Sequence, residues 1–199
     1  MKNQTKTHLQ SLTECGAMIA LAVALSWFKI PLWGNGGSVD LVSVPILLLA
    51  FRLGTGWGLV SGAVFGLVKC LIFGGIGWGL PSVLLDYVIA YAMLGLCGLF
   101  RGKGRAGLLL GTLVGCVGRF CSHFLSGVLV WRIAVGESVE LFGGTFTNSE
   151  LYSLLYNGGY MLGNLVIALI AMLILYPLLE KNGLLERKNA KKREKLLKK

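Results

Sequence analysis

The sequence has 199 residues, of which 55% are hydrophobic and only 14% are charged, and its mean hydropathy is +0.72. Soluble domains carry about 25% charged residues, so this composition excludes a water-soluble fold and a large catalytic domain outside a membrane. Apolar stretches of about 20 residues, the length that crosses a bilayer, recur along the chain. We therefore expect an all-α, multi-pass protein of the cell membrane, with a single transmembrane domain over residues 1–180 and a basic cytoplasmic tail over residues 181–199.

Six transmembrane helices are expected, over residues 9–28, 41–53, 57–73, 80–100, 108–131 and 151–179. The second is short. At 1.5 Å per residue it reaches only about 20 Å, less than the roughly 30 Å hydrocarbon core. Irregular backbone beside a short helix is tolerated in a membrane only where it is buried in protein or lines a cavity. The loop that contains Trp33 is therefore either part of a site or the ragged end of a tilted helix.

The basic residues predict the orientation. Most of the 19 Lys and Arg residues lie at the N-terminus, in the turns after the second and fourth helices, and in the tail, whereas only Lys29 and Arg132 lie in the opposite loops. By the positive-inside rule both termini are cytoplasmic. The net charge of +10 lies largely in the tail, so we interpret it as a membrane flank and expect no nucleic-acid partner. The outer loops are mildly acidic and weakly favour cationic ligands; their acidic residues are Asp40, Glu137, Glu140 and Glu150.

Small residues spaced four apart line one face of three helices and allow close backbone approach. For the third and fifth helices we expect internal packing; the residues are Gly58, Gly62, Gly66, Gly107, Gly111 and Gly115. The stripe on the first helix, made of Gly16, Ala20 and Ala24, faces either the interior or another protein.

Ionisable residues inside apolar helices are costly and therefore informative. Glu14 is expected to reach water or a lysine, and Lys69 to extend toward the interface. Asp86 lies deeper, and Arg119 and His123 are one helical turn apart. Asp86 is expected either to face a ligand or to form a structural ion pair with Arg119.

The polar and aromatic residues of the last three helices share the outer half of the membrane with the Trp33 loop. They are Asp86, Tyr87, His123, Trp131, Tyr152 and Asn157. A carboxylate, an imidazole, an amide and aromatic rings together predict a pocket for a flat, hydrogen-bonding, cationic small molecule. The five cysteines lie in apolar stretches without a CxxC motif, so no metal or cofactor is expected. The glycine-rich turn at 98–104 has the wrong spacing for a phosphate loop, and no catalytic motif occurs.

Several segments match a known family in order and spacing: GGSV at 36–39, VPI at 44–46, AFR at 50–52, LDY at 85–87, RFCSHFLSG at 119–127 and LYSLLYNGGYM at 151–161. Over about residues 9–180 the chain resembles the thiamine-specific substrate-binding (S) component of bacterial energy-coupling factor transporters. The resemblance implies a protein that captures thiamine outside the cell and works with a membrane-embedded coupling protein and two cytoplasmic ATPases.

The resemblance also assigns residues. The first loop closes over the pocket, and the stripe Gly16, Ala20 and Ala24 docks the coupling protein. The implied ligand contacts are Trp33, Asp86, Tyr87, Arg119, His123, Gly127, Trp131, Tyr152 and Asn157. One position departs from the family pattern, in which a glutamate stands where this sequence has Asp86.

Two other interpretations remain open from the sequence. The chain could serve a related vitamin or a precursor such as free hydroxymethylpyrimidine. It could also be a membrane-embedded enzyme that uses Asp86, Arg119 and His123 in acid–base chemistry.

Overall fold

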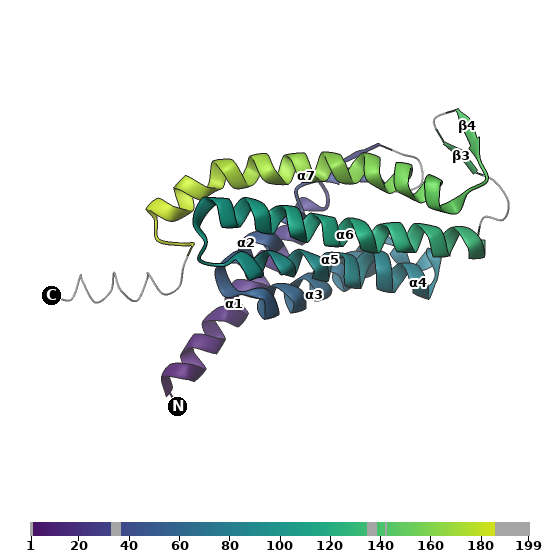
Figure 1. The fold of residues 1–199 in the computed structure, drawn as a ribbon. Coiled ribbons are helices and arrows are strands. Elements are labelled where there is room, and N and C mark those ends of the chain that lie inside the picture. The colour runs from purple at the N-terminus through teal and green to yellow at the C-terminus, as the bar shows by residue number, and fades with distance from the viewer. Residues whose placement is uncertain (1, 33–36, 135–138, 142, 186–199) are drawn as a thin grey trace.

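Helices packed side by side form one elongated bundle (Figure 1). The computed structural model describes residues 2–32, 37–134, 139–141 and 143–185. In this part of the chain, five spans are long and apolar enough to cross a membrane, and one helix is shorter. The long spans are α1 (Lys2–Leu25), α3 (Thr55–Phe73), the composite span Leu80–Phe100, α6 (Gly104–Ala134) and α7 (Ser149–Lys181). These spans and the short helix confirm the predicted six-helix, all-α membrane fold.

The short helix, α2 (Ser43–Leu53), is buried in the bundle along most of its length. Ile46, Leu47 and Phe51 belong to the hydrophobic core. A single residue, Gly54, joins α2 to α3, and its φ of 104° lies in a region that favours glycine. The short second span of the sequence is therefore a core helix.

Two hairpins replace the irregular loops that the sequence suggested. Strand β1 (Lys29–Pro31) pairs antiparallel with β2 (Ser38–Asp40), and β3 (Val139–Leu141) pairs with β4 (Gly144–Phe146). Helix α1 ends at Leu25, before the predicted end at Phe28, because the chain turns there into β1. The β3–β4 hairpin lies at the end of the bundle opposite the N-terminus of α1 and the C-terminal end of α7 (Figure 1).

The sequence predicts one uniform helix over residues 80–100, but the fourth span is a composite of several helix types. After the short 3₁₀ turn η1 (Gly75–Trp78) it runs through α4 (Leu80–Ser82), the π-helical η2 (Val83–Ile89), α5 (Ala90–Met93) and the 3₁₀-helical η3 (Leu94–Phe100). The hydroxyl of Ser122 on α6 donates to the carbonyl of Leu85 inside the π-helical turn, at 2.5 Å. Such turns interrupt α-helices frequently at functional sites.

The glycine stripe of α3 packs against this composite span. A Cβ on Gly62 would collide with the carbonyl of Tyr91, and one on Gly66 with the carbonyl of Tyr87. On α6, a Cβ on Gly111 would approach the Cys97 sulfur at 2.7 Å. The predicted internal packing of both stripes is confirmed.

The stripe on α1 behaves differently. Gly16, Ala20 and Ala24 are exposed, and a Cβ on Gly16 would meet no described atom within 4 Å. The opposite face of α1 contacts the bundle through buried Cys15 and Ala22. Glu14 pairs with Arg52 at 2.8 Å, an arginine in place of the predicted lysine, and its side chain stays 30% exposed.

Candidate functional site

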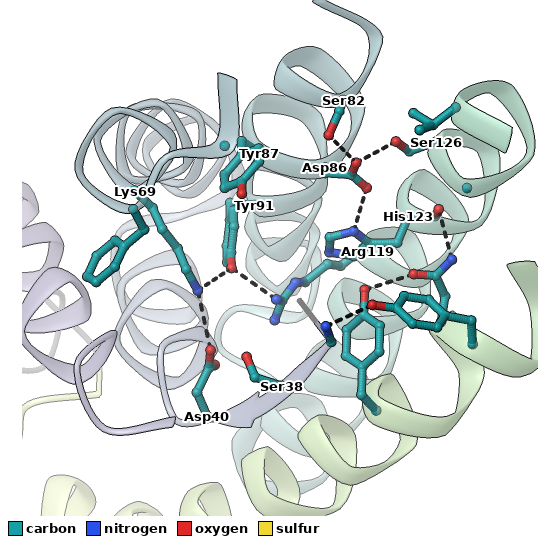
Figure 2. Close-up of a pocket in the computed structure, with 18 of the residues that line it drawn as sticks. Ser38, Asp40, Lys69, Ser82, Asp86, Tyr87, Tyr91, Arg119, His123 and Ser126 are labelled. Atoms are coloured by element: carbon teal, nitrogen blue, oxygen red, sulfur yellow. Dashed lines mark hydrogen bonds and ion pairs between the residues drawn. The ribbon is translucent and has the colours of Figure 1, made fainter. Parts of the chain in front are cut away.

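A cavity of about 470 Å³ lies between β2, α3, the composite span, α6 and α7. Two groups of polar side chains face each other across it (Figure 2). Asp86 and His123 form one group, Lys69 and Asp40 form the other, and Tyr91 and Arg119 lie between them. The volume falls within the range typical of small-molecule sites.

The acidic group is centred on Asp86 in the π-helical turn η2. Its Oδ2 accepts from the hydroxyls of Ser82 at 2.6 Å and Ser126 at 2.5 Å, and its Oδ1 lies 2.8 Å from Nδ1 of His123. A carboxylate has about four acceptor sites, so these three contacts leave it able to accept one more hydrogen bond.

His123 presents an unpaired nitrogen. Its side chain is 9% exposed, and among the described residues its Nε2 has no hydrogen-bond partner. Because the Asp86 carboxylate accepts from Nδ1, the neutral ring carries its proton there and Nε2 is an acceptor. Asp86 therefore offers an acceptor to a ligand that brings N–H donors, and the buried Nε2 of His123 is a second, unpaired acceptor beside it.

Helix α7 forms an aromatic and amide wall. The rings of Tyr152 and Tyr156 stack, with centroids 5.4 Å apart and planes at 14°. Asn157 donates to the backbone carbonyl of His123 at 3.2 Å and accepts from the hydroxyl of Tyr160 at 2.8 Å. This wall approaches α6 closely at Gly127, where a Cβ would clash with Ser153.

The second group, Lys69 with Asp40, is buried, and together with the neighbouring Arg119 it forms the basic group of the cavity, whose members are paired with one another or with nearby side chains. Lys69 lies 3.3 Å from Asp40 and donates to the Tyr91 hydroxyl at 2.7 Å. Arg119 donates to Ser43 at 2.7 Å and to Tyr91 at 3.1 Å, and its guanidinium lies 4.4 Å from the centre of the Tyr91 ring. Its Nε has no partner among the described residues.

The structure brings seven of the predicted ligand contacts to this one cavity: Asp86, Tyr87, Arg119, His123, Gly127, Tyr152 and Asn157. Trp33 and the side chain of Trp131 lie outside the described residues. The alternative ion pair between Asp86 and Arg119 is wrong, because the two side chains are held by different partners.

Two further expectations are corrected. Lys69 does not extend to the interface, since its side chain is only 13% exposed, and Asp40 is a buried partner of Lys69 rather than an exposed loop charge. Sequence reasoning also left out Ser82, Ser126, Tyr156 and Tyr160. Helical spacing could have found the serines, because Ser82 lies four residues before Asp86 and Ser126 three after His123.

The chain is similar to proteins of one family. A family model described as "Thiamine transporter protein (Thia_YuaJ)" matches residues 12–182. The thiamine transporter ThiT of Bacillus subtilis is 30% identical, across 87% of this chain and 93% of that protein; ThiT of Lacticaseibacillus paracasei is 28% identical, across 86% and 89%.

Two solved structures share the fold. ThiT from Listeria monocytogenes has a TM-score of 0.77 at 22% identity, covering 90% of this chain and 99% of that one. The S component of a bacterial ECF transporter has a TM-score of 0.65 at 16% identity, covering 87% and 97%.

Proposed function

This chain belongs to the thiamine transporter protein family, and we propose that it captures thiamine outside a bacterial cell as the substrate-binding subunit of an ATP-driven energy-coupling factor importer. The observation that carries the proposal is the Asp86 carboxylate on the wall of the cavity, which keeps a free acceptor site beside the unpaired Nε2 of His123. The pair complements the ligand that the family name gives.

Thiamine has two rings with different demands. Its aminopyrimidine carries an exocyclic amino group with two N–H donors, which the remaining acceptor site of Asp86 and Nε2 of His123 can receive. Hydrogen bonds to a charged group contribute about 1.5–3 kcal/mol. We assign these two residues to the aminopyrimidine.

The second ring, the thiazolium, is permanently positive. None of the described Lys and Arg residues forms an ion pair with Asp86, so its charge is available to a cation in the cavity. The stacked rings of Tyr152 and Tyr156 add electron-rich faces, and a cation–π contact in a desolvated site contributes about 2 kcal/mol. We assign the thiazolium to this aromatic side, together with Trp33 and Trp131.

In this proposal the energy for transport comes from partner ATPases, which agrees with a sequence that contains no nucleotide-binding motif of its own. In our proposal a membrane-embedded coupling protein docks on the exposed stripe Gly16, Ala20 and Ala24, and two cytoplasmic ATPases drive it. Small residues let the backbones of two membrane helices approach closely, which suits this stripe to a helical partner.

The enzyme interpretation loses its basis. It requires Asp86, Arg119 and His123 to act on one substrate atom, whereas Arg119 is fixed on Ser43 and Tyr91. Capture of a precursor such as hydroxymethylpyrimidine is distinguished from capture of thiamine by comparing the affinities of the two compounds.

Calorimetric titration of the detergent-purified protein tests the proposal. We expect saturable one-to-one binding of thiamine and weaker binding of hydroxymethylpyrimidine, which has the amino group but lacks the cation. Absence of thiamine binding to folded protein would contradict the proposal, and tighter binding of the pyrimidine alone would favour the precursor.

A further inference from the structure

One side chain of α7 anchors β2 beside the cavity. Asn164 is 2% exposed; its amide nitrogen donates to the carbonyl of Ser38 at 2.8 Å, and its amide oxygen accepts from the backbone N–H of Asp40 at 3.0 Å. These two backbone groups flank Val39. The Asn164 amide thus pairs with β2 as the backbone of a neighbouring strand would.

The surface around Asn164 fits the strand. Val39 packs on Tyr160 and Met161, and a Cβ on Gly163 would come within 2.8 Å of a Val39 methyl carbon. One helical turn before Tyr160 on α7, the hydroxyl of Tyr156 accepts from the N–H of Gly37 at 2.9 Å. Helix α7 therefore provides a seat for β2 in which hydrogen bonds and shape both match.

The seated strand supplies a charge to the basic group of the cavity. Asp40 lies 3.3 Å from Lys69, and Figure 2 shows the contacts continuing through Tyr91 to Arg119. The side chain of Asp40 is only 2% exposed. If β2 left its seat, Lys69 would lose its carboxylate inside the membrane, where an unpaired charge is costly. The position of β2 and the arrangement of the cavity are therefore coupled.

We propose that Asn164 is a positioning residue for ligand capture. It does not line the cavity; it seats β2 on α7, and the seated strand fixes Asp40, Lys69 and the adjoining wall. The inference rests on the proposed function for the choice of ligand. Because the ligand binds the seated form, the measured affinity falls in proportion to the fraction of protein in which β2 is seated.

Two independent changes unseat the strand. Asn164→Ala removes both hydrogen bonds to β2, together with the one that Asn164 donates to the carbonyl of Tyr160 at 2.9 Å. Gly163→Ala pushes on Val39 while leaving the Asn164 amide in place. The second change can be reversed, because adding Val39→Ala removes the methyl carbons that clash with the new Cβ. Asn182→Ala is the matched control: its side chain donates four residues back, to Leu178, as that of Asn164 does to Tyr160, but Asn182 lies just beyond the C-terminal end of α7.

The measurements are the thiamine affinity, the thiamine dissociation rate, and hydrogen exchange of the segment 38–40 in ligand-free protein. Loss of two buried hydrogen bonds corresponds to roughly a 10- to 100-fold change in an equilibrium constant. We expect Asn164→Ala to weaken binding by up to that factor, mainly through faster dissociation, and to expose the segment to exchange. Gly163→Ala should act in the same direction, and the Val39→Ala/Gly163→Ala double variant should recover binding relative to Gly163→Ala alone.

Parent-like affinity and dissociation in Asn164→Ala would overturn the proposal, as would a double variant no better than Gly163→Ala. If Asn164→Ala does not fold, the comparison of Gly163→Ala with the Val39→Ala/Gly163→Ala double variant tests the proposal by itself. Hydrogen exchange separates this inference from the proposed function: protein that never binds thiamine refutes the function, whereas unchanged protection of residues 38–40 in Asn164→Ala refutes the anchor.

Discussion

Asp86 is a carboxylate in an apolar span, where a buried charge is costly unless hydrogen bonds compensate it. Two serine hydroxyls and the His123 ring provide that compensation without using a lysine or arginine. The residue is therefore stable in the empty cavity and still carries its charge. This combination suits a site that waits for a cationic ligand.

Replacing Asp86 with Asn tests this role. The variant keeps the shape but loses the charge, so we expect thiamine affinity to fall by about 1.5–3 kcal/mol while the melting temperature without ligand changes little. Calorimetry and thermal unfolding on one preparation measure both. Asp86→Glu, which restores the residue that the family resemblance implies, is the control that keeps the carboxylate. A folded Asp86→Asn variant with parent-like affinity would remove Asp86 from the site.

For single residues, the sequence predicts how deep a side chain lies in the membrane better than it predicts which side chains it contacts. Five of the contacts at the cavity follow from depth, because residues at similar depth on neighbouring helices converge whenever their faces point inward, whereas Arg119 and Gly127 come from the family resemblance. Depth alone does not give the rotation of each helix, so the sequence leaves Arg119 open as a partner of Asp86. The Asp40–Lys69 pair joins a strand to a helix and carries no periodic signal.

Among the elements, the long helices follow from hydropathy, whereas their interruptions do not. An apolar run of about 20 residues predicts a span because backbone groups in lipid must be satisfied internally. The same run does not specify the π-helical turn at Val83–Ile89, which depends on tertiary contacts such as that of Ser122 with Leu85. The three-residue strands are too short for an alternating pattern to show.

The glycine stripe of α3 gives a prediction at the scale of elements. Gly66→Ala would force a Cβ against the carbonyl of Tyr87, next to Asp86, so we expect it to lower stability by about 1–3 kcal/mol and to weaken thiamine binding. Gly56→Ala on the same helix is the matched control, because a Cβ there meets no described atom within 4 Å. Thermal unfolding in detergent compares the two; equal melting temperatures would mean that close packing at Gly66 is unimportant.

For the whole molecule, the distribution of Lys and Arg predicts that both termini are cytoplasmic and that the β3–β4 hairpin faces outward. Thr145 is an exposed position of that hairpin, better suited to replacement than Gly143, whose φ is 75°. In a background without the native cysteines, Thr145→Cys should react with an impermeant maleimide in intact cells. Asn182→Cys, at the other end of α7, should react only after permeabilisation. The reverse pattern would invert the topology.

Transport depends on the assembled importer, in which we propose that α1 docks the coupling protein. Ala20 is exposed on the stripe of α1, so Ala20→Trp adds bulk outside the bundle and away from the cavity. Steric blockage there should abolish ATP-dependent thiamine uptake while leaving the affinity of the isolated subunit nearly unchanged. Val60→Trp is the matched control, because Val60 is 62% exposed on α3 and adds the same bulk elsewhere on the apolar surface. Normal uptake in cells that carry Ala20→Trp would show that the coupling protein does not dock on this face. Loss of uptake in both variants would show that bulk anywhere on the surface is disruptive. Loss in Ala20→Trp alone, with binding intact, would separate capture from delivery and assign delivery to α1.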